Sequence, residues 1–222
     1  NMQKTSIEDQ LIQALYSLGK IEFANVYKPS KFDWERCSRT DKGVSAMKIV
    51  VTGKMLDYED EFGDDLHSPL SVDRLNAILP DDIRVFSYVR ISNHFNPHLN
   101  TFSRQYSYLL PVTDLKRLGV DLDRILFEKS LQVFQGTHYM KNYSGSIRHW
   151  NKSLRQFYVR TINSIDVESV HLNQKEFWNV TLNGNSFLYH QIRKMIGASI
   201  ATSCGSWSFE YLQKCPSCSS FS

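Results

Sequence analysis

Residues 177–203, FWNVTLNGNSFLYHQIRKMIGASIATS, show the change of hydrophobic period that decides the fold class. The first six residues are mostly aromatic, β-branched or apolar, which is typical of a strand. From Phe187 to about Ser203 apolar residues return every three or four positions, which predicts a helix with the apolar stripe Leu188, Ile192, Met195, Ile196 and Ile200. A strand followed by a helix that packs beside it is typical of α+β domains.

The rest of the chain continues this mixture of strands and helices. Thr5 and Glu8 have the spacing of a capping box before a helical stripe that ends at Gly19, and Ser71 is placed to cap a helix through Leu79. We expect another helix at 121–135 and further strands at 47–55 (buried), 83–89, 102–110 and 157–167. This order predicts an α+β fold with a largely antiparallel central sheet and helices packed on one face.

The chain of 222 residues is long enough for one large domain or two small ones around a shared core. We expect an N-terminal half at 1–110, a C-terminal half at 111–205 and a tail at 206–222.

The charge is unevenly distributed. The net charge is only +3, but residues 131–222 hold nine basic and four acidic side chains. Five of the basic residues stand between 141 and 160 with aromatic neighbours and no acidic residue: Lys141, Arg148, Lys152, Arg155 and Arg160, with Tyr143, His149, Trp150, Phe157 and Tyr158. Basic groups bind phosphates and flat rings stack on bases, so the segment is either an RNA-binding face or an ordinary solvated basic surface.

Several classes of protein are disfavoured. Four cysteines are too few for a disulfide framework in a chain of this length, and the C-x-x-C of Cys215 and Cys218 has no second ligand pair nearby, so we expect no metal site. No apolar run reaches about eighteen residues, so we expect no membrane partner.

The hexapeptide RTDKGV at 39–44 suggests a carboxylate presented by a tight turn. Gly43 gives the backbone freedom to turn, and Arg39 would share one side of the chain with Asp41. A nearby cation favours the ionised carboxylate, which can act as a nucleophile or base. The alternative is an ordinary turn aspartate that bonds its own backbone.

Two further segments have the same ambiguity. Alternation in RQYSY at 104–108 puts Arg104, Tyr106 and Tyr108 on one face, where they could hold a phosphate and a base or form a core aromatic ladder. If 187–197 is helical throughout, Tyr189 faces Arg193 and His190 faces Lys194; His190 could then be a ligand or base, or an ordinary packed histidine.

Together the three segments resemble the TruA family of tRNA pseudouridine synthases, its eukaryotic branch in particular. The family motifs R-T-D-[AK]-G-V, R-x-Y-x-Y and F-x-x-H-x-[IV]-R-x-x-[IV]-G match residues 39–44, 104–108 and 187–197 in the same order. The resemblance covers about residues 5 to 200. It also leads us to expect that the chain lacks a strand before its first helix and further structure after its last one.

The resemblance implies a role for each matching residue. Asp41 corresponds to the catalytic aspartate, Arg39 to the arginine that helps to turn out the base, Tyr106 to the ring packed on the uracil, and Arg193 to the partner of the aspartate. The other expected RNA contacts are Lys42, Arg104, His190 and Lys194, with Lys152 and Arg155 from the basic segment.

The reaction that the resemblance implies is the isomerisation of uridine to pseudouridine in tRNA or another structured RNA. It moves the ribose from N1 to C5 of the same uracil, so no cofactor or metal is required, and the base must first leave its stack. The chain is compatible with a monomer and with a homodimer. The nucleus is the favoured location for a eukaryotic member, with the mitochondrion and cytosol left open.

Two alternatives remain at this point. A catalytically inactive RNA-binding module of the same fold would need the basic and aromatic residues without the set of Arg39, Asp41 and Arg193. A metal-dependent nuclease or deaminase would need clustered ligands such as H-x-E with C-x-x-C, and the sequence has no such set.

Overall fold

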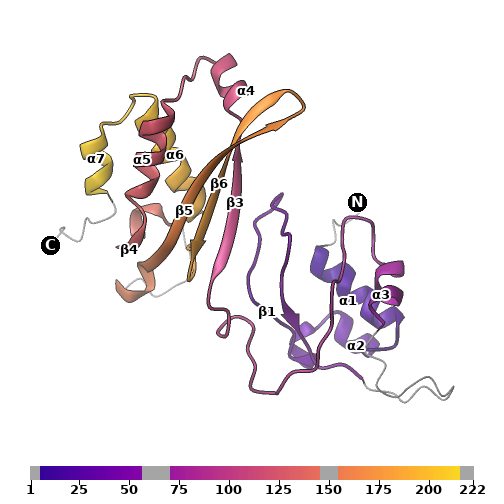
Figure 1. The fold of residues 1–222 in the computed structure, drawn as a ribbon. Coiled ribbons are helices and arrows are strands. Elements are labelled where there is room, and N and C mark those ends of the chain that lie inside the picture. The colour runs from indigo at the N-terminus through magenta and orange to yellow at the C-terminus, as the bar shows by residue number, and fades with distance from the viewer. Residues whose placement is uncertain (1–5, 57–70, 146–154, 216–222) are drawn as a thin grey trace. The chain divides into compact units, whose positions relative to one another are not determined.

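The computed structural model describes residues 6–56, 71–145 and 155–215, and it divides into two compact units (Figure 1). Unit 1 comprises Asn1–Thr101 and unit 2 comprises Phe102–Ser222. We had expected the boundary after residue 110, which would separate the strand at 104–110 from the strand with which it pairs.

Unit 1 is built from short elements around a small apolar core. Its helices are α1 (Ile7–Ser17), α2 (Phe23–Val26) and α3 (Val72–Ile78), with the 3₁₀ helix η1 (Pro29–Phe32) and the antiparallel pair β1 (Glu35–Arg36) and β2 (Val51–Thr52). The core includes Ile12, Leu15, Phe32, Trp34 and Leu75.

The helix caps of unit 1 follow the expected chemistry. Ser71 caps α3 by accepting from Arg74 N, as predicted. The capping box of α1 lies one residue further than we predicted: Ser6 accepts from Asp9 N at 3.1 Å and Asp9 accepts from Ser6 N at 2.8 Å. The predicted cap, Thr5, lies outside the described residues.

Two strands predicted in unit 1 are not formed as expected. Within 47–55 the strand β2 comprises Val51 and Thr52 alone, and the expected buried strand is not formed, since Val50 is 45% and Met47 94% exposed. Residues 83–89 form no strand in the structure. The backbone of Val85 bonds to the side chain of Asn76 and not to another strand. The Asn76 amide accepts from Val85 N at 2.8 Å and donates to Val85 O at 2.9 Å.

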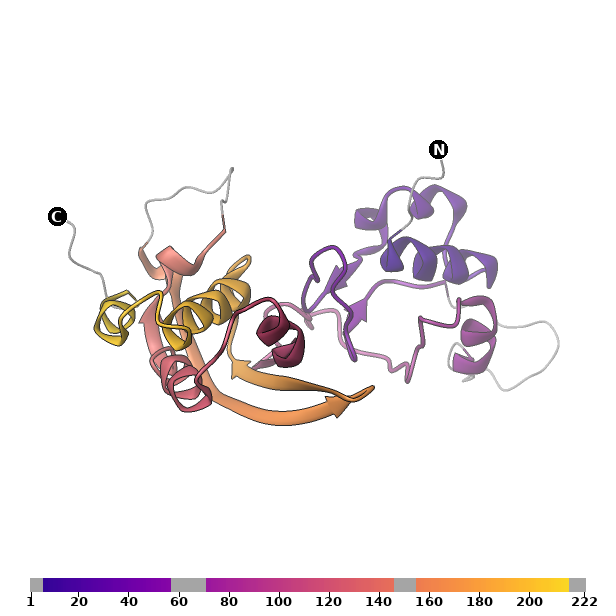
Figure 2. The same cartoon turned by 90° about the horizontal axis from the view of Figure 1, so that it is seen from above.

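Unit 2 is a four-stranded antiparallel sheet with its helices on one face (Figure 2). The strands are β3 (Arg104–Leu110), β4 (Gly136–Tyr139), β5 (Val159–Leu172) and β6 (Lys175–Gly184), in the spatial order β3-β6-β5-β4. The helices are α4 (Val112–Arg117), α5 (Arg124–Gln132), α6 (Gln191–Ser203) and α7 (Phe209–Lys214), with the 3₁₀ turns η2 (Lys141–Tyr143) and η3 (Arg155–Tyr158). This architecture confirms the predicted α+β class.

The helices and the sheet of unit 2 enclose one apolar core. Alternate residues of β6, Trp178, Val180 and Leu182, are buried against Phe127 of α5 and Met195 of α6. Burying a large apolar side chain contributes about 1.5–3 kcal/mol, so this layer is the main source of stability for unit 2.

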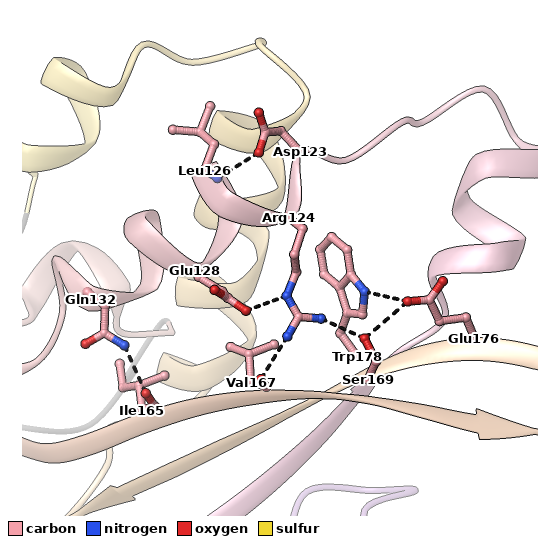
Figure 3. A network of polar contacts seen from close by, with 10 residues as sticks. All are labelled: Asp123, Arg124, Leu126, Glu128, Gln132, Ile165, Val167, Ser169, Glu176 and Trp178. Atoms are coloured by element: carbon pink, nitrogen blue, oxygen red, sulfur yellow. Dashed lines mark hydrogen bonds and ion pairs between the residues drawn. The ribbon is translucent and has the colours of Figure 1, made fainter.

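A polar network fastens α5 across β5 and β6 (Figure 3). Arg124 donates to Val167 O at 2.8 Å and to the Ser169 hydroxyl at 3.1 Å, pairs with Glu128, and places its guanidinium 4.8 Å from the centre of the Trp178 ring. At the other end of the helix the Gln132 amide donates to Ile165 O at 2.9 Å. These contacts fix the helix along the strand as well as against it.

The tail contains a helix that the sequence analysis missed. α7 lies within the expected tail at 206–222, and its Leu212 is fully buried in the core of unit 2. The short helix α4 was also missed. No helix in the described part of the chain is long and apolar enough to cross a membrane.

We predict that Leu212→Ala lowers the free energy of unfolding of unit 2 by about 2–5 kcal/mol, because it leaves a cavity under α7. Urea unfolding would be followed by tryptophan fluorescence in a Trp34→Phe background, where the remaining tryptophans all belong to unit 2. The control is Leu118→Ala, at a side chain that is 79% exposed. Equal effects of the two substitutions would show that α7 does not contribute to the core.

Candidate active site

The segment RTDKGV forms the tight turn that the sequence predicts. Val44 N donates to Asp41 O at 3.0 Å, and Gly43 has φ +78°, as the third residue of a type II turn requires. Asp41 is half-buried, whereas Arg39 and Lys42 are exposed. The loop starts and ends on the β1–β2 pair, where Cys37 N donates to Val50 O at 3.0 Å.

The segment RQYSY lies on β3 with the predicted alternation. Arg104, Tyr106 and Tyr108 are partly buried, and Gln105 and Ser107 between them are exposed. Arg104 donates to Asn185 O at 2.7 Å. The ring of Tyr106 stands edge-on to Phe187, with 5.2 Å between the ring centres.

The third segment differs from the prediction at its start. Helix α6 begins at Gln191, so Phe187 to His190 form a loop, and His190 is the N-cap with φ 61°. The loop is held by Gln191, which is fully buried: its side chain accepts from Leu188 N at 2.8 Å and its own N–H donates to Leu188 O at 3.0 Å. Tyr189 and His190 therefore precede α6, contrary to the prediction of a helix throughout 187–197, and Lys194 N donates to His190 O at 3.1 Å in the first turn.

Two residues of this segment, Tyr189 and Lys194, are hydrogen-bonded to residues 141–145. Lys194 donates to Ser144 O at 2.6 Å and to Asn142 O at 3.2 Å, and Gly145 N donates to Tyr189 O at 2.7 Å. The Tyr189 ring stacks on His190, with 3.7 Å between centres. Lys194 thus has backbone partners in the structure, although we had expected it to contact RNA.

The described aromatic residues of the basic segment pack inward. Tyr143 and Tyr158 belong to the core of unit 2, and Phe157 packs against it. Burial lowers the pKa of Arg160, which donates to Phe157 O and Val159 O, both at 2.7 Å. An RNA surface cannot use the two buried tyrosines for stacking. Arg148, His149, Trp150 and Lys152 lie outside the described residues, and Arg155 is the first residue of η3.

The structure brings the second and third segments together within unit 2. In the ladder between β3 and β6, Arg104 is opposite Gly184 and Tyr106 is opposite Leu182, so the loop after β6 runs beside both side chains. Arg193 and Lys194 follow on the exposed side of the first turn of α6. Arg39, Asp41 and Lys42 belong to unit 1.

Two residues that shape this region, Gln191 and Asn185, are not among the predicted site residues. The dipeptide Gly184-Asn185 at the end of an alternating strand is a turn signal that could have marked Asn185. A buried glutamine at the start of a helix has no comparable signal. Among the described residues no group of three or more His, Cys, Asp or Glu side chains could hold a metal ion.

Comparison with known proteins identifies the class of protein that the chain resembles. Residues 131–216 match the family model for tRNA pseudouridine synthase. The chain is 30% identical to the mouse pseudouridylate synthase 1 homolog over 90% of this chain and 46% of the relative. It is 27% identical to tRNA pseudouridine synthase A of Methanobrevibacter smithii over 94% of this chain and 66% of the relative, and 24% identical to the human tRNA pseudouridine(38/39) synthase over 86% and 41%.

Residues 131–216, which hold β4, β5, β6 and α6, match a tRNA pseudouridine synthase domain. The match over residues 131–216 and the similarity of most of the chain to pseudouridine synthases agree with the resemblance of the chain to the TruA family. It spans about half the length of the curated relatives that it matches, 46% in two cases and 60% in a third.

We predict opposite effects of two glycine substitutions in unit 2. A Cβ at Gly184 would lie 2.7 Å from Thr161 O and 3.0 Å from the Phe187 ring, so Gly184→Ala should destabilise unit 2 by about 1–3 kcal/mol. Gly197 lies inside α6 with nothing within 4 Å, so Gly197→Ala should stabilise it by about 0.5–1 kcal/mol. Urea unfolding in the Trp34→Phe background measures both, and a harmless Gly184→Ala would contradict the close packing of Phe187.

Proposed function

We propose that this protein isomerises uridine to pseudouridine in tRNA, with Asp41 as the catalytic carboxylate and without a cofactor. The family match carries this proposal, and the order of the three matching segments supports it. The names of relatives that include tRNA pseudouridine synthases support the choice of tRNA as substrate.

The proposed reaction is balanced within the substrate. The bond between ribose C1′ and uracil N1 breaks, and a bond between C1′ and C5 forms. The proton at C5 is lost to a base or water, and N1 gains a proton. The carboxylate of Asp41 could attack C1′ or C6 or remove a ribose proton, and each route needs it ionised.

The surrounding residues have distinct proposed roles. Tyr106 holds the uracil while it turns, and its contact with Phe187 supports a fixed ring. Arg193 keeps Asp41 ionised, because a nearby cation favours the charged carboxylate. Arg39 helps to extract the base, and Arg104, Lys42, His190, Lys194, Lys152 and Arg155 bind RNA. The backbone bonds of Lys194 favour a smaller share in RNA binding for that residue.

We predict that Asp41→Asn abolishes turnover. The assay is release of tritium to water from tRNA that carries tritium at uracil C5, because only rearrangement at C5 frees the label. We expect a loss of more than about 10³-fold, with tRNA affinity within a few-fold of the unsubstituted chain.

A matched control is Asp33→Asn, at an exposed carboxylate that pairs with Lys54. Tight tRNA binding with no tritium release by the unsubstituted chain would favour the inactive RNA-binding module. Loss of turnover in the presence of a chelator would favour a metal-dependent enzyme instead.

We also predict that Arg193→Leu reduces kcat more than it weakens tRNA binding. A hydrogen bond to a charged group contributes about 1.5–3 kcal/mol, so its loss should lower kcat by about 10- to 100-fold. Arg193→Lys retains the charge and should recover part of the rate. A change confined to affinity would contradict the proposed pairing with Asp41.

A further inference from the structure

Asn185 joins three parts of unit 2 at the end of β6. Its N–H donates to Thr161 O at 3.1 Å, and its side-chain oxygen accepts from Thr161 N at 3.3 Å and from Ser186 N at 2.7 Å. Its own carbonyl accepts from the Arg104 guanidinium at 2.7 Å. One residue therefore connects β5, β3 and the loop that leads to α6.

The same loop determines the surroundings of Tyr106. Phe187 follows Asn185 by two residues, and its ring covers Gly184, where a Cβ would lie 3.0 Å from it. Phe187 in turn stands edge-on to Tyr106. The turn stabilised by the Asn185 side chain thus contacts Arg104 through the Asn185 carbonyl and Tyr106 through the Phe187 ring.

We propose that Asn185 is a positioning residue for the target nucleotide, acting through Arg104 on the phosphate and through Phe187 and Tyr106 on the uracil. The inference rests on the proposed function, since it assigns these two side chains to the substrate. Productive geometry tolerates errors of only about 0.5 Å, so a loosened turn slows the reaction even when the chain remains folded.

The chemistry of the amide provides a sharp test. Both hydrogen bonds of the side chain use its oxygen as an acceptor, and its NH₂ group makes none with the residues that the structure describes. Aspartate has the same shape and keeps both acceptor contacts, whereas alanine keeps neither. Asn185→Asp should therefore preserve the turn, while its added charge should weaken RNA binding at low salt.

The experiment measures kcat and tRNA affinity at a temperature where all variants are folded. We expect Asn185→Ala to lower kcat by about tenfold and Asn185→Asp to restore it to within about threefold, with weaker binding. Asn163→Ala, at an exposed asparagine beside the register shift of β5, should change neither. In a Tyr106→Leu background, Asn185→Ala should add less than about twofold, because both act on the same contact.

Two results would overturn the inference. One is an Asn185→Asp variant with a kcat as low as that of Asn185→Ala. The other is a double variant, Asn185→Ala with Tyr106→Leu, in which the two reductions of kcat multiply. If the unsubstituted chain releases no tritium, the proposed function fails by itself. The Asn185 variants are then compared by tRNA affinity, with Arg104→Ala in place of Tyr106→Leu. If Asn185→Ala and Arg104→Ala each reduce the affinity by the same factor alone and in combination, the positioning role is rejected.

Discussion

The antiparallel pairing of β3 with β6 is the interaction on which the organisation of unit 2 depends. It sets Arg104 opposite Gly184 and Tyr106 opposite Leu182, although about eighty residues separate the partners along the chain. A shift by one residue would turn every β3 side chain to the other face of the sheet. The core prevents this, because Leu110 at the end of β3 is buried together with Trp178 and Val180 of β6.

The loop that follows β6 shows how this order is carried to α6. His190 has a left-handed backbone, which costs a residue other than glycine on the order of 1 kcal/mol or more. The two bonds between Gln191 and Leu188 on one side, and the bonds of Lys194 to Ser144 and Asn142 on the other, offset that cost. The direction in which α6 leaves the sheet is therefore set by polar contacts as well as by the apolar stripe.

The sequence predicted correctly the features that depend on residues close together in the chain. The alternation in β3, the cap at Ser71 and the turn at Gly43 are of this kind. It did not predict features that depend on contacts between residues far apart in the chain. Val85 is bonded by a side chain of α3 in place of a strand, and Tyr143 and Tyr158 are core residues whose neighbours in sequence are basic. The apolar stripe also begins before α6, because Leu188 is buried from a loop, so the spacing could not reveal that the helix starts at Gln191.

The residues proposed for the reaction are supported by different kinds of element: a strand, a helix and a turn. Tyr106 is in the middle of a strand paired along its whole length, and Arg193 is in the first turn of a helix fixed at its start. Asp41 is carried by a turn in which Val44 N donates to Asp41 O, a bond that contributes about 0.5–1.5 kcal/mol. In the proposed reaction a base turned out of its stack needs a fixed surface to receive it, and the paired strand around Tyr106 would supply one.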